Sequence, residues 1–460
     1  MLNVSISSCC PNEQRYILDV ILGEFLGLDF EVFEHDDQNT KISRINDDLE
    51  LSLSNDFFNK AERYWLKTES MPVLPLDIWA PSTDGVSALL VDENIPVLYG
   101  QPSLIKIGNH WDLKLDIFGS AFFMLSRYEE LITTDRDNHD RFPSYGSVGY
   151  KAGFLSRPIV NEYVEILWEC IHTLWPDLQR KKRKGKNFIT CDADWPFDPA
   201  IYSLSRMIKT CGRQILREYS PLDAIKTCNR FLLNKLGFDV NDQYRENISW
   251  MMDVNEQAGN KMAFYFITYK TSDIDTDEDF DSLRMRALFR EIHSRGHELG
   301  LHPGYITHAN PANFAKSVEK LRQVFKEENI KQTQVGGRMH FLRWDANQTP
   351  GLWNDHGFDY DSTLSYADSA GFRCGVCYDF TMYDLANRCA FRLKQRPLIV
   401  MECSVIAPRY ENLGYSVESM DRFNQFKTYC RIYNGTYTFL WHNSFFKNKH
   451  DKIFYKELIK

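Results

Sequence analysis

Hydrophobic residues beyond position 187 fall into short runs that alternate with longer amphipathic stretches. The apolar runs predict strands at residues 188–191, 263–268, 298–302, 333–338, 398–405 and 436–442. Amphipathic stretches such as 281–294 and 312–327 predict helices between them. Strands that alternate with helices are typical of parallel βαβ units, and a series of such units favours an α/β barrel. Barrel enzymes place their chemistry at the carboxyl ends of the strands.

The first part of the chain shows a different pattern, with short β-like runs such as 96–99 beside two apolar helical stretches. Residues 116–131 predict a buried helix, because Phe118, Phe122 and Leu125 fall on one side of it. A second helix is expected at 161–174. This part contains no catalytic constellation, so we look for the chemistry beyond it.

A basic segment, QRKKRKGKN, separates the two patterns and predicts a domain boundary. A chain of 460 residues is long for one domain and comfortable for two. We therefore expect a smaller α+β domain at 1–184 and a barrel domain at 185–460. Residues 201–252 exceed what one crossover connection requires, which predicts a helical insertion in the barrel domain.

The composition is that of a globular protein and argues against binding to nucleic acid. Lysine and arginine number 54 against 63 acidic residues, a net charge of -9, and the 14% aromatic content is too high for a disordered chain. The basic run at 180–184 stands alone, so we interpret it as a solvated linker.

The start of the chain and its cysteines favour a reducing compartment. Residues 1–16 lack both the basic lead and the apolar core of a secretory signal, and no segment holds eighteen consecutive apolar residues. The eleven cysteines are odd in number and scattered, which suits reduced thiols, and the lone CxxC at Cys374 and Cys377 is interpreted as structural. We expect a cytoplasmic protein without a transmembrane segment.

Polar residues stand at the carboxyl ends of four predicted strands. Asp192 and Asp194 follow the first, and because residues two apart in a strand face the same side, both could point into one site. His302, Arg338 and His442 end three of the other strands. Since these ends meet at one mouth of a barrel, the side chains are candidates for a shared site.

The segment HELGLHPGYITH invites comparison with the helical zinc motif HExxH, but does not fit it. The second histidine, His302, comes one position too late after His297, and Gly300 and Pro303 oppose a helix. In a strand the two histidines face opposite ways, so at most one enters the site. His302, at the strand end, is the candidate, and His297 is interpreted as structural.

Four of these motifs together resemble those of the polysaccharide deacetylases, the NodB-like enzymes of carbohydrate esterase family 4. The matching stretches are TCDADWP, GHELGLHP, RMHF and TFLWHN, and the resemblance covers residues 188–446. The run from GGRMHFLRW to YDSTLSYADSAGFRCG further resembles a bacterial subgroup with an additional N-terminal domain. The resemblance implies a distorted, partly open (β/α) barrel and a site for a divalent metal.

The resemblance also implies roles for individual residues. Asp192 would be the general base, paired with Arg338, and His442 the general acid. Asp194 and His302 would bind the metal, for which Zn²⁺ is the first expectation, although Co²⁺, Ni²⁺ and Mn²⁺ also suit such ligands.

The sequence departs from the family pattern at the third metal ligand. The family has a second histidine four residues after the first, where this chain has Ile306. His308 is the expected substitute and His340 is a second possibility. Glu402 either orients a partner in the site or is a buried structural acid.

The implied substrate is an N-acetylated, or less favourably an O-acetylated, sugar or polysaccharide precursor. Residues expected near it are Trp195, Tyr305, His340, Phe341, Asp361, Arg373 and Trp441. For the aromatic residues among these, a place in the hydrophobic core is an alternative.

Two other functions stay open on the sequence alone. One is a carbohydrate-binding or scaffold protein that kept the fold and lost the metal. The other is a metal-dependent hydrolase of a different non-peptide amide, such as a ureide or a cyclic imide, because a fold does not fix a substrate.

Overall fold

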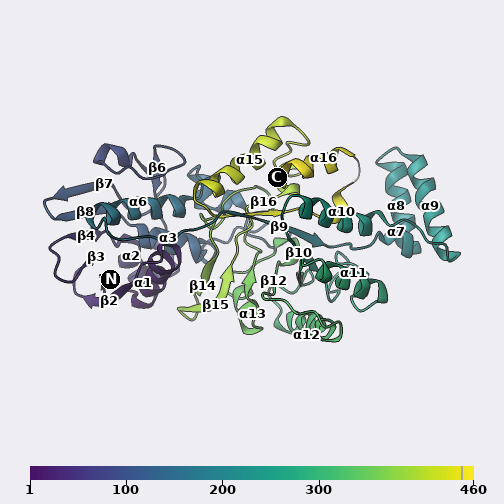
Figure 1. Cartoon of the computed structure of the whole chain (residues 1–460), viewed down its shortest axis with the longest axis horizontal. Helices are drawn as coiled ribbons and strands as arrows, with labels where there is room; N and C mark the ends of the chain where they lie inside the picture. The colour runs from purple at the N-terminus through teal and green to yellow at the C-terminus, as the bar shows by residue number, and fades with distance from the viewer. Residues whose placement is uncertain (447–448) are drawn as a thin grey trace. The chain divides into compact units, whose positions relative to one another are not determined.

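The computed structural model of the chain describes residues 1–446 and 449–460 and divides into two compact units. One unit contains Met1–Asn187 and Phe341–Phe439, and the other contains Phe188–His340 and Leu440–Lys460. Both combine helices with strands, and the chain forms several sheets, so the predicted mixed α/β class is confirmed (Figure 1). The predicted domain division at 184/185 stays a prediction.

A six-stranded sheet forms the start of the first unit, in the order β2-β1-β3-β4-β8-β7. Its strands are β1 (Leu2–Ser7), β2 (Phe30–His35), β3 (Thr40–Ser43), β4 (Glu50–Leu53), β7 (Gly100–Ile107) and β8 (His110–Leu115). In β1 every second residue, Leu2, Val4 and Ile6, is fully buried, as the period of a strand requires. A separate pair joins β5 (Asp77–Trp79) to β6 (Ile95–Val97), so the first two residues of the β-like run predicted at 96–99 lie in a strand.

Helices accompany this sheet in the same unit. They are α1 (Pro11–Leu18), η1 (Asp19–Leu26), α2 (Asp56–Tyr64), η2 (Thr68–Ser70), η3 (Pro81–Asp84), α3 (Ile117–Leu125), α4 (Glu129–Ile132), η4 (Ser144–Gly146), α5 (Val148–Lys151) and α6 (Ile159–Leu174). Helix α6 confirms the prediction at 161–174. The helix predicted at 116–131 is interrupted, because Arg127 takes a left-handed φ of 57° between α3 and α4.

The later residues of the first unit add short strands and helices. These are η5 (His340–Leu342), α13 (Thr349–Asp355), β13 (Tyr360–Asp361), β14 (Phe380–Asp384), β15 (Cys389–Gln395), β16 (Val400–Met401), α14 (Glu402–Ile406), α15 (Val417–Ile432) and β17 (Thr436–Leu440). The first residue of η5, His340, and the last residue of β17, Leu440, belong to the second unit. The strand predicted at 398–405 is wrong in its second half, because Glu402 begins a helix there.

Four neighbouring strands of the second unit run parallel in the order β12-β11-β10-β9. They are β9 (Lys186–Ala193), β10 (Met262–Phe266), β11 (Glu298–Leu301) and β12 (Gly336–Gly337), and they confirm the predicted strands at 188–191, 263–268 and 298–302. All five residues of β10 are buried, as expected of a parallel strand covered on both faces. Helices α11 (Leu283–Ser294) and α12 (Pro311–Glu327) pack against β11 and confirm the predicted amphipathic helices.

The predicted insertion is helical, as expected. It consists of α7 (Pro199–Tyr202), α8 (Leu204–Leu216), α9 (Pro221–Lys235) and α10 (Gln243–Gln257), and α7, α8 and α9 contact one another (Figure 1). The unit ends with η6 (Asn443–Phe445) and α16 (Lys449–Leu458). Among the helices described, none is long and apolar enough to cross a membrane.

Candidate metal centre

Three side chains of the second unit form a cluster with the composition of a metal site. Asp194, His302 and His340 each offer one ligand atom, and these atoms lie within 4.8 Å of one another. His302 Nε2 is 3.1 Å from Asp194 Oδ1, and His340 Nε2 is 3.8 Å from Asp194 Oδ2. One carboxylate oxygen and two imidazole nitrogens are a ligand set that suits Zn²⁺ and related divalent ions.

Parallel strands bring the three ligands together. Asp194 directly follows β9 and His302 directly follows β11, while His340 comes three residues after β12. Because these strands run parallel in one sheet, their carboxyl ends meet at one edge. This edge of the sheet therefore brings the three side chains together.

The hydrogen bond on the far side of the His302 ring orients it for ligation. Nδ1 lies 2.6 Å from the carbonyl oxygen of Arg338, which can only accept, so Nδ1 carries the proton. In the neutral ring Nε2 then presents a lone pair towards Asp194 Oδ1, a buried atom that accepts no hydrogen bond from the described residues. A cation between or beside these two atoms 3.1 Å apart, either a proton on Nε2 or a divalent ion, satisfies both of them.

His340 is held by a buried carboxylate, Asp275. Its Nδ1 lies 2.8 Å from Asp275 Oδ1, and this leaves Nε2 directed at Asp194. Asp275 is itself fixed, because its carboxylate accepts hydrogen bonds from the backbone amides of Thr271, Ser272 and Tyr305. A carboxylate behind a ligating histidine fixes the ring orientation and raises its basicity. Asp275 is not among the residues predicted from the sequence, although it lies in TSDIDTD, an acidic segment that begins three residues after the predicted strand at 263–268.

The charges in the cluster are strongly coupled. Burial opposes ionisation of Asp194, but the positive charge of His340 and the contact with His302 outweigh it and hold the pKa of Asp194 well below its usual value. Burial also opposes a charge on His340, yet Asp194 and Asp275 raise the pKa of this imidazole to about 9. The pKa of Asp275 falls to about 2, because the hydrogen bond and charge of His340 outweigh the effect of burial. A cation is therefore favoured at this position, and a metal ion would replace the proton on His340.

Asp192 and Arg338 form a buried ion pair beside the cluster. Arg338 is fully buried, and its Nη1 donates to Asp192 Oδ1 at 2.7 Å and to Thr190 Oγ1 at 2.9 Å. The other carboxylate oxygen, Oδ2, lies 4.0 Å from His302 Nε2. Arg338 thus holds one oxygen of Asp192 and leaves the second beside the metal ligands.

His442 approaches the same cluster from the end of β17. Its Nε2 lies 3.8 Å from Asp194 Oδ2, and its side chain keeps a 12% exposed fraction. The preceding residue anchors this segment, because the Trp441 amide donates to the Thr190 carbonyl at 3.1 Å. Five of the predicted site residues, Asp192, Asp194, His302, Arg338 and His442, thus lie together with His340.

Three other residues of the second unit were predicted at the site, and the structure gives them other surroundings or contacts. His308 is buried but lies outside the three-residue cluster, so the geometry favours His340 as the third ligand. Tyr305 contributes its backbone amide to Asp275. The ring of Trp441 is fully buried and stacks on Phe446 at 5.4 Å, which favours the core alternative over contact with a sugar.

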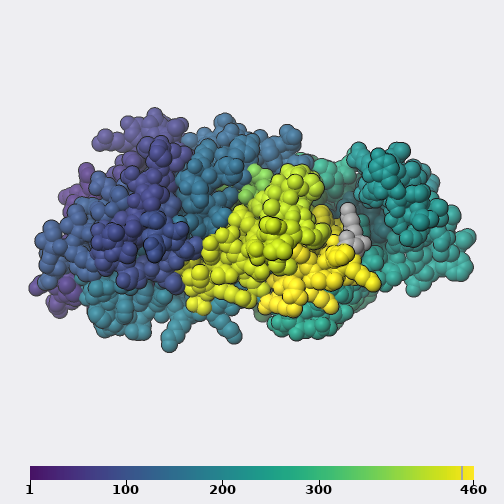
Figure 2. All heavy atoms as spheres, turned by 90° about the horizontal axis from the view of Figure 1, so that it is seen from above, coloured from purple at the N-terminus to yellow at the C-terminus, as the bar shows by residue number. Residues whose placement is uncertain are grey.

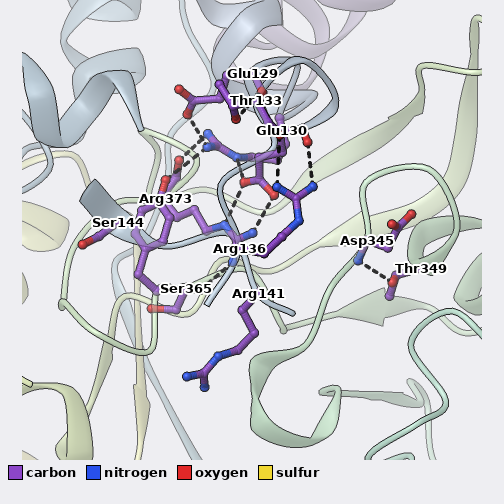
Figure 3. Close-up of polar contacts among 12 residues, drawn as sticks. Glu129, Glu130, Thr133, Arg136, Arg141, Ser144, Asp345, Thr349, Ser365 and Arg373 are labelled. Carbon is purple, nitrogen blue, oxygen red and sulfur yellow. Dashed lines mark hydrogen bonds and ion pairs between the residues drawn. The ribbon is translucent and has the colours of Figure 1, made fainter. Parts of the chain in front are cut away.

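The other predicted substrate residues belong to the first unit. Arg373 is buried, and its guanidinium is engaged by both carboxylate oxygens of Glu130 and by the Ser365 carbonyl (Figure 3). Asp361 is fully buried and accepts a hydrogen bond from the Thr363 amide at 2.9 Å. These contacts indicate that both residues have a structural role in the first unit.

Two further residues were expected near the site. The ring of Phe341 lies 4.8 Å from that of His139, also in the first unit. Glu402 is buried at the start of α14, and both alternatives stay open for it. The eleven cysteines, including Cys374 and Cys377, are present as thiols.

Comparisons with known proteins cover different parts of the chain. Residues 2–176 match the model of a family of unknown function, DUF7033. No curated protein matches the sequence. One similar solved structure is that of a Mycobacterium smegmatis protein assigned as a polysaccharide deacetylase, with 14% identity, a TM-score of 0.38, and coverage of 62% of this chain and 84% of that one. Another is the Puue allantoinase, with 10% identity, a TM-score of 0.32, and coverage of 46% and 65%.

Proposed function

We propose that the protein is a metal-dependent hydrolase that removes N-acetyl groups from a sugar or polysaccharide precursor. The observation that supports this most is the Asp194, His302 and His340 cluster with an Arg338-bound carboxylate, Asp192, beside it. The proposal includes a deacetylase-type distorted barrel for residues 185–460. It also rests on the motif resemblance noted in the sequence.

Hydrolysis of an amide requires an activated water and a stabilised oxyanion. When bound by Asp194, His302 and His340, a divalent ion would supply Lewis acidity that polarises a carbonyl and acidifies water. The residues around it must then move two protons.

In this proposal Asp192 accepts the first proton, from the attacking water. Arg338 binds Oδ1 at 2.7 Å and fixes the carboxylate plane, so Oδ2 is the oxygen available as a base. The burial of both side chains excludes competing solvent around the ion pair. Asp192 is thus a base and Arg338 its positioning residue.

In this proposal His442 delivers the second proton, to the leaving amine. An amine leaves poorly unless it is protonated, and an imidazole can donate near neutral pH. His442 Nε2 lies 3.8 Å from Asp194 Oδ2, and the residue is partly exposed, so a substrate can reach it. Acid and base catalysis of this kind contribute roughly 10²–10⁴-fold each.

A substrate screen on the zinc-loaded protein tests this proposal. The panel would hold N-acetylhexosamine oligomers, nucleotide-linked N-acetylhexosamines, an O-acetylated sugar, a ureide and a cyclic imide. We expect acetate release from at least one N-acetylated sugar. Turnover of only the ureide or the imide would show that the substrate is a different amide and not an acetylated sugar. No turnover by a protein that also fails to bind Zn²⁺ or Co²⁺ would favour a scaffold.

A further inference from the structure

A cavity of about 780 Å³ opens beside Asp194 in the second unit. The start of the helical insertion lines it, together with Asp194, Trp195 and the segment after His442. A volume of this size is typical of small-molecule sites. The side chain of Asp194 is 21% exposed whereas that of His302 is 1% exposed, so the cluster is open on its Asp194 side, where the cavity lies.

The cavity is strongly cationic. Five basic side chains, Arg206, Lys209, Arg213, Arg217 and Arg230, line it, against two carboxylates, Asp194 and Asp198. The whole chain has a net charge of -9, so this concentration of positive charge runs against the composition. It therefore calls for a local explanation.

Four of the basic residues form a stripe along α8. Arg206, Lys209 and Arg213, at spacings of three and four residues, lie on one face of α8, and Arg217, the residue that caps its C-terminus, follows four residues later. Like charges at these spacings destabilise a helix. An anion bound in the cavity would offset that repulsion.

Two of these cations have no ion-pair or hydrogen-bond partner among the described residues. Three of the five form ion pairs with acidic side chains. Arg206 lies 2.6 Å from Asp277, Arg213 lies 3.2 Å from Glu218, and Arg230 lies 3.2 Å from Asp198. The side chains of Lys209 and Arg217, in contrast, make neither an ion pair nor a hydrogen bond within residues 1–446 and 449–460. Both are therefore available to a ligand.

We propose that this cavity binds the phosphate groups of the substrate, which would make the substrate an acetylated sugar carried on a diphosphate. This inference rests on the proposed function, because it places the phosphates beside the deacetylation site. Several guanidinium and ammonium groups match the two or more charges of a diphosphate better than the single charge of a sugar carboxylate. Trp195 lines the same cavity next to Asp194, with the Arg206 guanidinium 4.8 Å from its ring, and offers an aromatic face to the sugar.

The diphosphate could be attached to a nucleoside or to a lipid. Helices α8 and α9 lie at the surface (teal in Figure 2) and carry large apolar side chains that are more than half exposed. Examples are Ile208, Leu216, Leu222 and Ile225, and Leu216 also lines the cavity. Exposed apolar surface next to a phosphate site favours the lipid-linked form.

Charge reversal at the two unpaired cations tests the proposal. We would measure calorimetric binding of UDP-N-acetylglucosamine and of farnesyl-diphosphate-linked N-acetylglucosamine to the full chain and to Lys209→Glu/Arg217→Glu. The matched control is Lys226→Glu/Lys235→Glu, which makes the same charge change on α9 at residues that do not line the cavity. We expect Lys209→Glu/Arg217→Glu to bind at least tenfold more weakly than the wild type, and the control variant to bind as the wild type does. Binding to the wild type should weaken as salt is added, and Lys209→Glu/Arg217→Glu should lose this dependence on salt. Tighter binding of one compound identifies the carrier.

The result separates this inference from the proposed function, because binding is measured without turnover. Equal binding to the wild type and both double variants, or binding of neither compound to the wild type, would overturn the phosphate site. Binding that the Lys209 and Arg217 reversals abolish, in a protein that releases no acetate, would overturn the deacetylase and leave the phosphate site standing.

Discussion

At the scale of single residues, the account depends on different roles for the two aspartates of CDAD. Asp192→Asn keeps the size of the side chain and its hydrogen bond from Arg338, but removes the base. We expect acetate release to fall by about 10²–10⁴-fold, while zinc content stays that of the wild type. Asp194→Asn should instead lower zinc content. An Asp192→Asn protein with normal turnover would contradict the assignment of the base.

The third metal ligand gives a second prediction for single residues. His340→Gln should weaken zinc binding most. Asp275→Asn should weaken it by about 10–100-fold, because the His340 ring would then be held less firmly in its orientation. His308→Gln is the control, since His308 lies outside the cluster. Competition with a chromogenic zinc chelator measures all three. A loss of affinity confined to His308→Gln would show that the sequence expectation was correct.

The sequence could predict those site residues that directly follow apolar runs. Asp194 and His302 are visible as polar residues just beyond β9 and β11. His340 was harder to place, because it lies in an irregular segment three residues after a two-residue strand. Asp275 could not be assigned, since its contact with His340 joins residues 65 positions apart. Such contacts depend on tertiary structure, which the spacing of residues along the chain does not reveal.

At the scale of elements, His297 ties the start of β11 to its neighbours. Its Nδ1 accepts from the Met262 amide at 3.0 Å, and Nε2 lies 3.1 Å from Glu256, so the neutral ring is the form that fits. Burial lowers the pKa of His297 to about 4 from an ordinary value of 6.5. Between these values the unfolded chain binds more protons than the folded one, so stability should fall as pH falls from 6.5 to 4, by up to about 3 kcal/mol.

Urea unfolding at a series of pH values checks this prediction. His297→Gln should be less stable than the wild type at pH 7.5, because the contacts are altered, but should lose less stability on going to pH 4.5. An unchanged dependence on pH in the variant would show that another group is responsible.

The close approach of β11 to its neighbours gives the second prediction for elements. A Cβ at Gly300 would lie 2.5 Å from the Gly336 carbonyl oxygen and 2.6 Å from the Tyr265 ring. Gly300→Ala should therefore destabilise the protein by about 1–3 kcal/mol. Gly212→Ala, in α8 with no atom within 4 Å of the added Cβ, should be neutral or stabilising. Thermal melts of both variants test this prediction. Equal melting temperatures would contradict the close packing described around Gly300.

Most elements followed from the hydrophobic pattern, and the exceptions have tertiary causes. The helix predicted at 116–131 breaks at Arg127, whose side chain forms buried ion pairs with Glu129 and Glu130. The strand predicted at 398–405 ends early because Glu402, a polar residue in an apolar run, starts a helix instead. Local apolar runs show where a strand can begin, but buried charges decide where it ends.

At the scale of the whole molecule, the chain is not divided simply in sequence order. The first compact unit takes in residues 341–439 after the second has begun. Hydrophobic patterns report local periodicity and do not reveal that a later segment of the chain joins the first unit. All residues of the proposed metal centre and phosphate cavity nevertheless belong to the second unit. We therefore attribute the chemistry to that unit.

The central claim is that one divalent ion in this unit is required for deacetylation. The most direct measurement follows zinc content and acetate release in the same preparation, after chelation and during stepwise return of zinc. The account predicts that activity is lost on chelation and returns in proportion to zinc, saturating at about one ion per chain. Acetate release that persists in the metal-free protein, or a chain that takes up one zinc ion and still releases no acetate from any acetylated sugar, would contradict it.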